Sequence, residues 1–316
     1  MTTQNFHQGE LRLQEHCGMR ETIGKMAERM IHDFIPERQR EFFGALEYVF
    51  LGTVDQRDLP HTSLVTGPVG FIQTPVPEKM VIQTGSRTHR PEFEALDVGQ
   101  SVGVLGIDLS CRRRNRVHGR VTAIDDHTIT IKVVQFYGNC PKYISLREIA
   151  QRQVGRPRQN VVSSSSLSPA DIHMISTSDT FFIASYVRDD SEEPYEGVDV
   201  SHRGGQPGFV SVDSNSQITI PDYAGNNLFN TLGNLLMNPA AGLLFIDFET
   251  GDELHIHGQA TLIEDSVEQA NYPGAQRLLR IQIQKASRQA AVTALRWKFI
   301  QFSPVNPVPE HNDKTL

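Results

Sequence analysis

The stretch that decides the fold consists of VDVSHRGGQPGFVSV at 198–212 and ITIPDYAGNNLFNTLGNLLMNPAAGLLFIDFETGDELHIHG at 218–258. β-Branched and aromatic residues occur there at the density typical of strands, and DYAGNN at 222–227 interrupts them. We therefore expect a strand, a second strand, a short helix and two further strands in that order. The polar and glycine-rich pieces fall at the joints between these elements.

A helix is predicted directly after the DYAGNN corner, because apolar residues recur there three and four positions apart. Asn226 or Asn227 can cap its start, and Asn238-Pro239 ends it. A helix that begins on a Gly-Asn-Asn corner directs unpaired backbone N–H groups outward, which suits an anion such as phosphate. The apolar positions are Leu228, Phe229, Leu232, Leu235 and Leu236.

A hydroxyl, an imidazole and a guanidinium follow one another at Ser201, His202 and Arg203, just before Gly204-Gly205. Arginine binds phosphate with two parallel hydrogen bonds, and glycine lets the backbone approach a ligand closely. Asparagine caps and solvated arginines are common when they occur singly. It is their combination within one stretch that indicates an anion-binding site.

An internal repeat is the clearest pattern in the chain. GVLGIDLSCRRRNRVHGRVTAI at 103–124 aligns without a gap to GLLFIDFETGDELHIHGQATLI at 242–263, with eight of 22 positions identical. About one or two identities would be expected by chance. The same offset places Arg87 over Asn226. We predict two copies of one β-rich unit, each a closed and twisted barrel of six or so strands with a helix between the third and the fourth.

The repeat and the composition also divide the chain. Helical spacing of apolar residues over 10–46 predicts an N-terminal arm that Pro36 interrupts, and a serine-rich polar segment marks a linker. A further short helix is expected at 91–96. The predicted parts are an arm at 1–46, a first barrel repeat at 47–150, a linker at 151–169, a second barrel repeat at 170–303 and a tail at 304–316.

Alternation along the repeated strand assigns its two faces. Val117 and Val121 are expected inside the first barrel, and Ile256 and Ala260 inside the second. The intervening polar residues face solvent or the partner barrel. His255 and His257 share that polar face, but the spacing supplies no third ligand, so no metal site is predicted.

The composition excludes several classes of protein. A formal net charge of −7 argues against nucleic acid as the main partner. There is no apolar window of about 18 residues and no apolar signal core at the N-terminus, so we expect a cytoplasmic protein without a membrane partner. Cys17, Cys111 and Cys140 are odd in number and lack a Cys-x-x-Cys pair, which favours reduced thiols.

The pattern resembles the pyridoxamine 5'-phosphate oxidase-related family of flavin-binding split barrels, over 45–145 and 175–265 and most closely in the second range. The segments that carry the resemblance, and that point to a tandem branch of the family, are SHRGGQPGFV, PDYAGN, FNTLGN, GLLFIDF, RRRNR and YGNCPKYI. The resemblance implies a mainly β fold of two tandem split β-barrels of the FMN-binding type with an N-terminal helical arm.

In such proteins FMN lies between two barrels, with its phosphate held by basic and hydroxyl side chains near the helix start. The resemblance therefore implies that the DYAGNN corner surrounds the phosphate and ribityl chain, and that the strand after the Gly-x-Pro turn flanks the ring. The implied FMN-binding residues are Ser201, His202, Arg203, Phe209, Val210, Ser211, Asp222, Tyr223, Asn226, Asn227, Arg87 and Arg90.

The chain also departs from the family pattern. The oxidase's Ser-Arg-Lys at the helix start is Gly225-Asn226-Asn227 here, and its strand glutamine before the closing glycine falls at Glu253. Pyridoxamine phosphate is therefore not expected as the substrate, and the assignment of the phosphate site is weakened.

Two functions follow from the resemblance. The first is an FMN-dependent oxidoreductase that acts on an unknown small molecule, with no catalytic residue evident beyond the flavin. His202 is the best titratable candidate, although a phosphate contact or a surface position is the commoner role. The alternative is a non-catalytic protein that binds or senses flavin, heme or a deazaflavin, or an interaction module with a degenerate pocket. Closed twofold assembly favours a homodimer, and the sequence leaves open whether FMN lies within one chain or between two.

Overall fold

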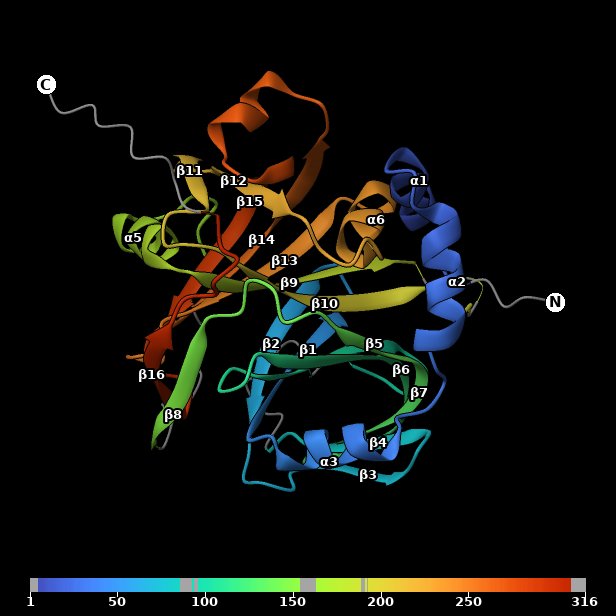
Figure 1. The fold of residues 1–316 in the computed structure, drawn as a ribbon. Coiled ribbons are helices and arrows are strands. Elements are labelled where there is room, and N and C mark those ends of the chain that lie inside the picture. Colours follow the sequence, from blue (N-terminus) through green and yellow to red (C-terminus); the bar gives the residue numbers. More distant parts are fainter. Residues whose placement is uncertain are drawn as a thin grey trace, which may run out of the picture.

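Two seven-stranded antiparallel sheets make up most of the molecule, shown by the computed structural model in Figure 1. The structure describes residues 5–85, 93, 96–153, 163–188, 191 and 193–307. The first sheet contains β1 (Tyr48–Val54), β2 (Pro60–Thr66), β3 (Ile72–Val76), β4 (Lys79–Gln83), β5 (Ser101–Asp108), β6 (Arg113–Ile124) and β7 (Thr128–Asn139). The second contains β9 (Thr180–Val187), β10 (Gly197–Gly204), β11 (Ser211–Ser214), β12 (Gln217–Tyr223), β13 (Ala240–Ile246), β14 (Glu253–Ile263) and β15 (Ala275–Gln289).

The two sheets have the same strand order, β2-β1-β5-β6-β7-β4-β3 and β10-β9-β13-β14-β15-β12-β11. Their registers also agree, because Gly103 pairs with His118 in the first sheet and Gly242 pairs with His257 in the second. The predicted repeat and the mainly β tandem split-barrel fold are confirmed. Each unit has seven strands rather than six, and the helix of the second unit lies between its fourth and fifth strands, not its third and fourth.

Each barrel has its own apolar interior. Val117 and Val121 are buried in the first core, and Ile256 and Ala260 are buried in the second. Both strands also carry the polar residues of their other face toward the opposite barrel. The face assignment made from alternation is therefore confirmed.

The barrels pack against each other through β1, β2, β5 and their counterparts, with Phe50 stacked on Phe182 at 3.5 Å between ring centroids. Gly103 lies against the backbone of Val198, and Gly242 lies against the backbone of Pro60. A side chain at either glycine would push the two barrels apart. These matching close approaches relate the two halves by an approximate twofold axis.

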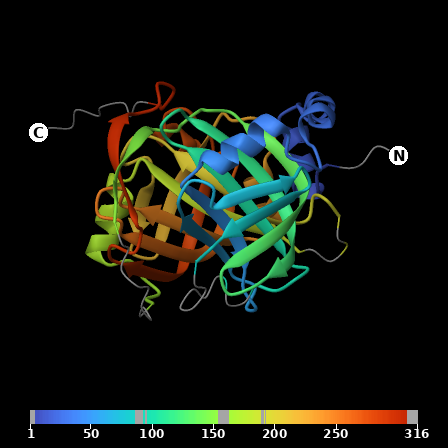
Figure 2. The same cartoon turned by 90° about the horizontal axis from the view of Figure 1, so that it is seen from below.

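A two-stranded ribbon of β8 (Leu146–Arg152) and β16 (Leu295–Gln301) joins the ends of the two halves. It lies on the same side of the molecule as α5 (Pro169–Thr177), as both views show (Figures 1 and 2). Ser168 caps α5 through the backbone N–H of Asp171. The 3-10 helix η1 (Val267–Asn271) precedes β15.

The N-terminal arm forms three helices, α1 (Gln8–His16), α2 (Arg20–Met30) and α3 (Glu37–Ala45). Helix α1 packs closely on α6 (Asn230–Met237), with Gly9 against the backbone of Gly233. The Asn230 Nδ2 donates a 2.6 Å hydrogen bond to Glu10 Oε1, and burial raises the pKa of Glu10 to about 8. The arm thus supports the helix that lines the site below.

Most of the helix predicted at 91–96 lies outside the described residues. None of the helices in the described ranges is both long enough and apolar enough to cross a membrane.

Candidate functional site

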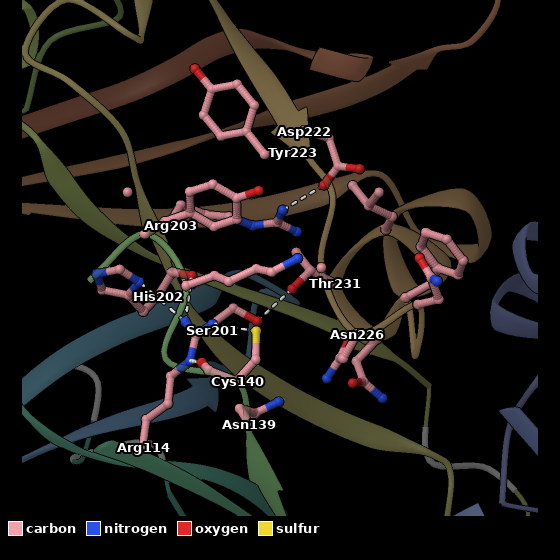
Figure 3. A pocket seen from close by; sticks show the side chains of 18 of the residues that line it. Arg114, Asn139, Cys140, Ser201, His202, Arg203, Asp222, Tyr223, Asn226 and Thr231 are labelled. Carbon is pink, nitrogen blue, oxygen red and sulfur yellow. Dashed lines mark hydrogen bonds and ion pairs between the residues drawn. The ribbon is translucent and has the colours of Figure 1, made fainter. Parts of the chain in front are cut away.

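A pocket lies between the two barrels, and side chains from both line it (Figure 3). We call it the inter-barrel pocket. The second barrel contributes β10, the corner after β12 and α6, while the first contributes β6 and residues 139–143. The volume of the pocket is about 100 Å³, and the pocket opens to solvent at its mouth. A phosphate-sized group therefore fits inside, and a larger ligand would extend out of the mouth.

Alternate residues of β10 present polar groups to one face. Ser201 Oγ donates to Asp199 Oδ2 at 2.9 Å and lies 2.6 Å from Thr231 Oγ1 on α6. Two residues further on, Arg203 Nη1 donates to Asp222 Oδ1 at 2.6 Å. Strand β10 is thereby tied to α6 and to the corner by hydrogen bonds that run across the pocket.

Arg116 on β6 reaches across from the first barrel into this network. Its Nη1 donates to both carboxylate oxygens of Asp199, at 3.1 and 3.2 Å, and its Nη2 donates to Ser201 Oγ. Burial alone would raise the pKa of Asp199, but Arg116 and His118 outweigh it and hold that pKa well below its usual range. Arg116 is therefore committed to a buried ion pair.

Arg114, two residues earlier on the same strand, has no such partner. Its Nε donates to the Cys140 carbonyl at 2.9 Å, and its Nη1 lies 3.2 Å from His202 Nδ1. Among the described residues no carboxylate forms an ion pair with it. Burial lowers the pKa of Arg114 to about 10, so the group is still charged near neutral pH. Arg114 is half-buried, and a cation removed from water without a carboxylate is costly. An anionic ligand would offset that cost.

His202 is buried and lies on the face of β10 opposite Ser201 and Arg203. It therefore does not occupy the surface position that the sequence analysis considered. Burial first, and then the charges of Arg114 and Arg147, hold the pKa of His202 well below its usual range. The ring is therefore neutral. Because Arg114 donates to Nδ1, the proton belongs on Nε2, which has no hydrogen-bond partner among the described residues.

The corner after β12 differs from its prediction. Helix α6 begins at Asn230, and its N-cap is Phe229 in the left-handed region at φ 63°, with no side-chain capping bond. Asn226 Oδ1 instead accepts from the Leu228 N–H at 3.2 Å. Asn227 is also left-handed, with φ 58°. The predicted cap at Asn226 or Asn227 was therefore wrong, because these two left-handed residues delay the helix.

Two tyrosines join the barrels at the pocket. Tyr143 and Tyr223 lie with ring centroids 5.3 Å apart, and the Tyr143 hydroxyl donates to the Ala224 carbonyl at 2.9 Å. Burial raises the pKa of Tyr223 to about 12 and also raises that of Tyr143. Both hydroxyls are therefore protonated near neutral pH.

Most of the predicted binding residues come together here. The eight that line the inter-barrel pocket are Ser201, His202, Arg203, Phe209, Asp222, Tyr223, Asn226 and Asn227. Val210 is buried in the second core, and Ser211 begins β11, so neither lines the pocket. Arg87 and Arg90 lie outside the described residues.

The residues that the first barrel contributes to the pocket were not predicted from the sequence. They are Arg114, Arg116, Asn139, Cys140, Lys142 and Tyr143. They belong to RRRNR and YGNCPKYI, which the sequence singled out only as motifs. The repeat alignment holds a usable signal, because Arg114 aligns with Glu253 and Arg116 with His255. A charge reversal inside an otherwise matching repeat indicates a position where the side chains of the two halves have different roles.

The approximate twofold axis places a counterpart of the pocket at β14 and β2. There His257 Nε2 lies 3.2 Å from His61 Nδ1. The equivalent contact beside the inter-barrel pocket joins His118 Nε2 to Asp199 Oδ1, also at 3.2 Å. His255 contacts Glu253 at 2.9 Å. Within the ranges described above, no group of three or more His, Cys, Asp or Glu residues is arranged to hold a metal.

Comparison with known proteins gives a match to one family model, described as pyridoxamine 5'-phosphate oxidase, over residues 35–162. No curated protein matches the chain. A solved putative pyridoxamine 5'-phosphate oxidase from Lactobacillus delbrueckii is 13% identical, covering 40% of this chain and 98% of that one with a TM-score of 0.31. An FMN-binding protein from Syntrophomonas wolfei is 12% identical over 39% and 83% (TM-score 0.27), and an FAD-binding protein from Mesorhizobium loti is 14% identical over 41% and 98% (TM-score 0.27).

Proposed function

Since residues 35–162 of this chain belong to the pyridoxamine 5'-phosphate oxidase family, we propose that the protein binds FMN in the inter-barrel pocket and acts as an FMN-dependent oxidoreductase. The observation that carries the proposal is Arg114. It is a half-buried guanidinium on the pocket wall whose hydrogen bonds go to two carbonyls, an imidazole and a thiol rather than to a carboxylate.

The charge balance of the pocket supports a phosphate ligand. Among the described residues, four cations line it, Arg114, Arg116, Lys142 and Arg203, against one carboxylate, that of Asp222. Behind them, Asp199 pairs with Arg116, and Arg277 donates to Asp222 at 2.9 Å. The count is then five cations to two carboxylates, which leaves three positive charges in excess. Arginine and lysine are the side chains that bind phosphate most strongly.

The remaining lining residues fit the other parts of FMN. Asn139 and Asn227 offer amide groups suited to ribityl hydroxyls, and the Tyr223 ring offers an aromatic surface near the mouth. The pocket volume of about 100 Å³ suits the phosphate end, so we expect the ring at the mouth. FMN supplies the redox chemistry, because its ring accepts and returns electrons.

The chain's own residues would bind and orient the flavin. Neutral His202 accepts a hydrogen bond from Arg114 and so fixes the direction of that guanidinium. Asp222 orients Arg203 in the same way. Among the histidine and tyrosines of the pocket, the resolved pKa shifts lead away from neutrality, since the pKa of His202 falls while those of Tyr143 and Tyr223 rise.

That last observation favours a second candidate function, a flavin-binding protein without turnover. The positioned side chains with shifted pKa values would not exchange a proton efficiently at neutral pH. Both candidates share the same binding site. They differ in whether a reduced nicotinamide or a partner reductase delivers electrons to the bound ring.

The test begins with the absorbance spectrum of the purified protein, followed by denaturation and identification of the released molecule. We expect a flavin spectrum and release of FMN. A colourless protein that also fails to bind added FMN contradicts the proposal. Bleaching of the flavin band by reduced nicotinamide, and its return with an electron acceptor, would separate the oxidoreductase from the binding protein. The homodimer stays a prediction that sizing chromatography can check.

A further inference from the structure

A second cavity lies away from the inter-barrel pocket, under the β8–β16 ribbon. Helix α5, the turn between β13 and β14, and the ribbon enclose it, and its volume is about 380 Å³. We call it the ribbon cavity. That volume falls within the range of small-molecule sites, about 300–1,000 Å³.

Buried polar side chains form part of its wall. Arg147 Nη2 donates to Asp179 Oδ1 at 2.5 Å, which is a single hydrogen bond between two groups that could make two. Arg147 Nη1 and Asp179 Oδ2 are left without a hydrogen-bond partner among the described residues, as is Thr180 Oγ1. Arg147, Asp179 and Thr180 are 7%, 4% and 1% exposed. A buried polar atom without a hydrogen-bond partner destabilises the fold, so this cluster indicates a polar partner.

The rest of the wall is aromatic and apolar. Phe248 and Trp297 lie edge to face with ring centroids 5.3 Å apart, and the Arg147 guanidinium lies 4.3 Å from the Phe248 centroid. Met174 of α5 also lines the cavity. Rings and a thioether favour a planar apolar body in the ligand.

The charges around the cavity narrow the chemical class of the ligand further. Arg147 and Asp179 neutralise each other. The other charged lining residues are three carboxylates, Asp247, Glu249 and Asp252, and one guanidinium, Arg288. The excess of two negative charges disfavours an anion. The unsatisfied donor and acceptor, Arg147 Nη1 and Asp179 Oδ2, complement a group that accepts one hydrogen bond and donates another.

From these observations we propose that the ribbon cavity binds a neutral planar aromatic compound bearing a carboxamide or an equivalent ring edge, with a carbonyl beside an N–H. The carbonyl accepts from Arg147, and the N–H donates to Asp179. The inference is independent of flavin binding, because none of the residues that carry it lines the inter-barrel pocket.

Trp297 gives the site its own signal, because it is the single tryptophan of the chain. Purified protein is titrated with benzamide while Trp297 fluorescence and saturation-transfer NMR of the ligand are followed. Acetophenone, which lacks the N–H, and benzoate, which is anionic, serve as matched ligands. We expect saturable binding of benzamide, with the two other ligands at least fivefold weaker, because each loses a hydrogen bond or gains repulsion.

Thr180→Val tests the wall itself. It removes the unpartnered hydroxyl without changing the shape, and should weaken benzamide binding about threefold to tenfold, because Thr180 lines the cavity and its hydroxyl has no other partner among the described residues. Thr66→Val on β2 is the control and should bind like the parent. Three results would overturn the proposal: no benzamide signal by either method, equal binding of all three ligands, or an unchanged affinity in Thr180→Val. A benzamide-induced shift of the flavin spectrum would also overturn it, by placing the ligand in the other pocket.

Discussion

The two positions where the barrels meet share their backbone and differ in their charges. On one side Arg114, Arg116 and His118 of β6 face β10 of the second barrel. On the other side the equivalent residues of β14 are Glu253, His255 and His257, of which His257 contacts His61 of β2. Strand order, register and the interface glycines are the same on both sides. The difference teaches that the repeat preserved what the barrels need in order to pack, while among the described residues only one side carries arginines suited to an anion.

The same difference appears on the opposing strands. Asp199, Ser201 and Arg203 of β10 correspond in register to His61, Ser63 and Val65 of β2. Only the serine is common to both. We therefore expect one phosphate-binding position in each chain, although the fold provides two equivalent places.

The largest expected effect separates the two arginines of β6. Arg116→Met should lower the free energy of unfolding by about 3–5 kcal/mol, because it leaves Asp199 as a buried charge with its main partner removed. Arg114→Met should leave stability unchanged or raise it, because it removes a half-buried charge that has no carboxylate partner among the described residues. Urea unfolding measures both. Equal losses in the two variants would contradict the distinction between a paired and an unpaired cation.

Substitutions in the two barrel cores should lower stability by similar amounts, unlike those at the two positions where the barrels meet. At Gly119 a Cβ would overlap the Lys132 carbonyl oxygen, and at Gly258 it would overlap the Gln282 carbonyl oxygen. Gly119→Ala and Gly258→Ala should each cost about 1–3 kcal/mol of unfolding free energy. Gly24→Ala, which meets nothing within 4 Å, is the control. If either core variant is as stable as the parent, the two halves do not share this close packing.

Acid should destabilise the protein through His257, which lies on the side of the barrel interface where β14 carries no arginine. Burial first, and then the charges of His61, His255 and Lys285, lower the pKa of His257 well below its usual range, against a smaller opposite effect of Asp55. The unfolded chain then binds a proton at higher pH than the folded chain. Stability from this group is complete above the unfolded pKa of about 6.5 and falls as the pH drops below it.

His257→Gln should therefore reduce the loss of stability between neutral pH and about pH 5.5 by about 1 kcal/mol. His7 and His202 have pKa values lowered in the same direction, so part of the acid dependence should remain. Urea midpoints at the two pH values report the change. An unaltered pH dependence in the variant would show that His257 is not buried as a neutral group.

The smallest effect concerns the tyrosine that joins the barrels. Tyr143→Phe removes the 2.9 Å hydrogen bond to the Ala224 carbonyl and should cost about 0.5–1.5 kcal/mol of unfolding free energy. Tyr272→Phe, half-buried near η1, is the control and should cost less. Equal costs would mean that the hydrogen bond across the pocket contributes nothing measurable.

Much of this comparison could be predicted from the sequence. The ungapped match of 103–124 to 242–263 predicted the tandem fold, because identical registers require identical spacing. The second-barrel half of the pocket was also predicted, since Ser201, Arg203 and Asp222 lie near one another along the chain. The first-barrel half was not predicted. Arg114 lies 88 residues from His202 in sequence, and only the packing of the barrels brings them to 3.2 Å.

Local backbone conformation accounts for the other errors. The left-handed conformations of Asn227 and Phe229 move the helix start to Asn230, and propensity alone does not reveal them. Val210 was expected beside the flavin ring, yet the second core buries it because an apolar side chain at that position packs best inside the barrel.

The most direct measurement compares the affinities of FMN and riboflavin for the parent protein and for Arg114→Met, by titration calorimetry. Riboflavin lacks the phosphate, so the ratio of the two affinities isolates the phosphate contact. We predict one FMN per chain, and a preference of the parent for FMN that falls about tenfold or more in Arg114→Met, while Arg113→Met, whose guanidinium lies over Phe42, keeps the parent ratio. Two FMN per chain, or an unchanged ratio in Arg114→Met, would contradict the conclusion that only one of the two equivalent positions holds the phosphate.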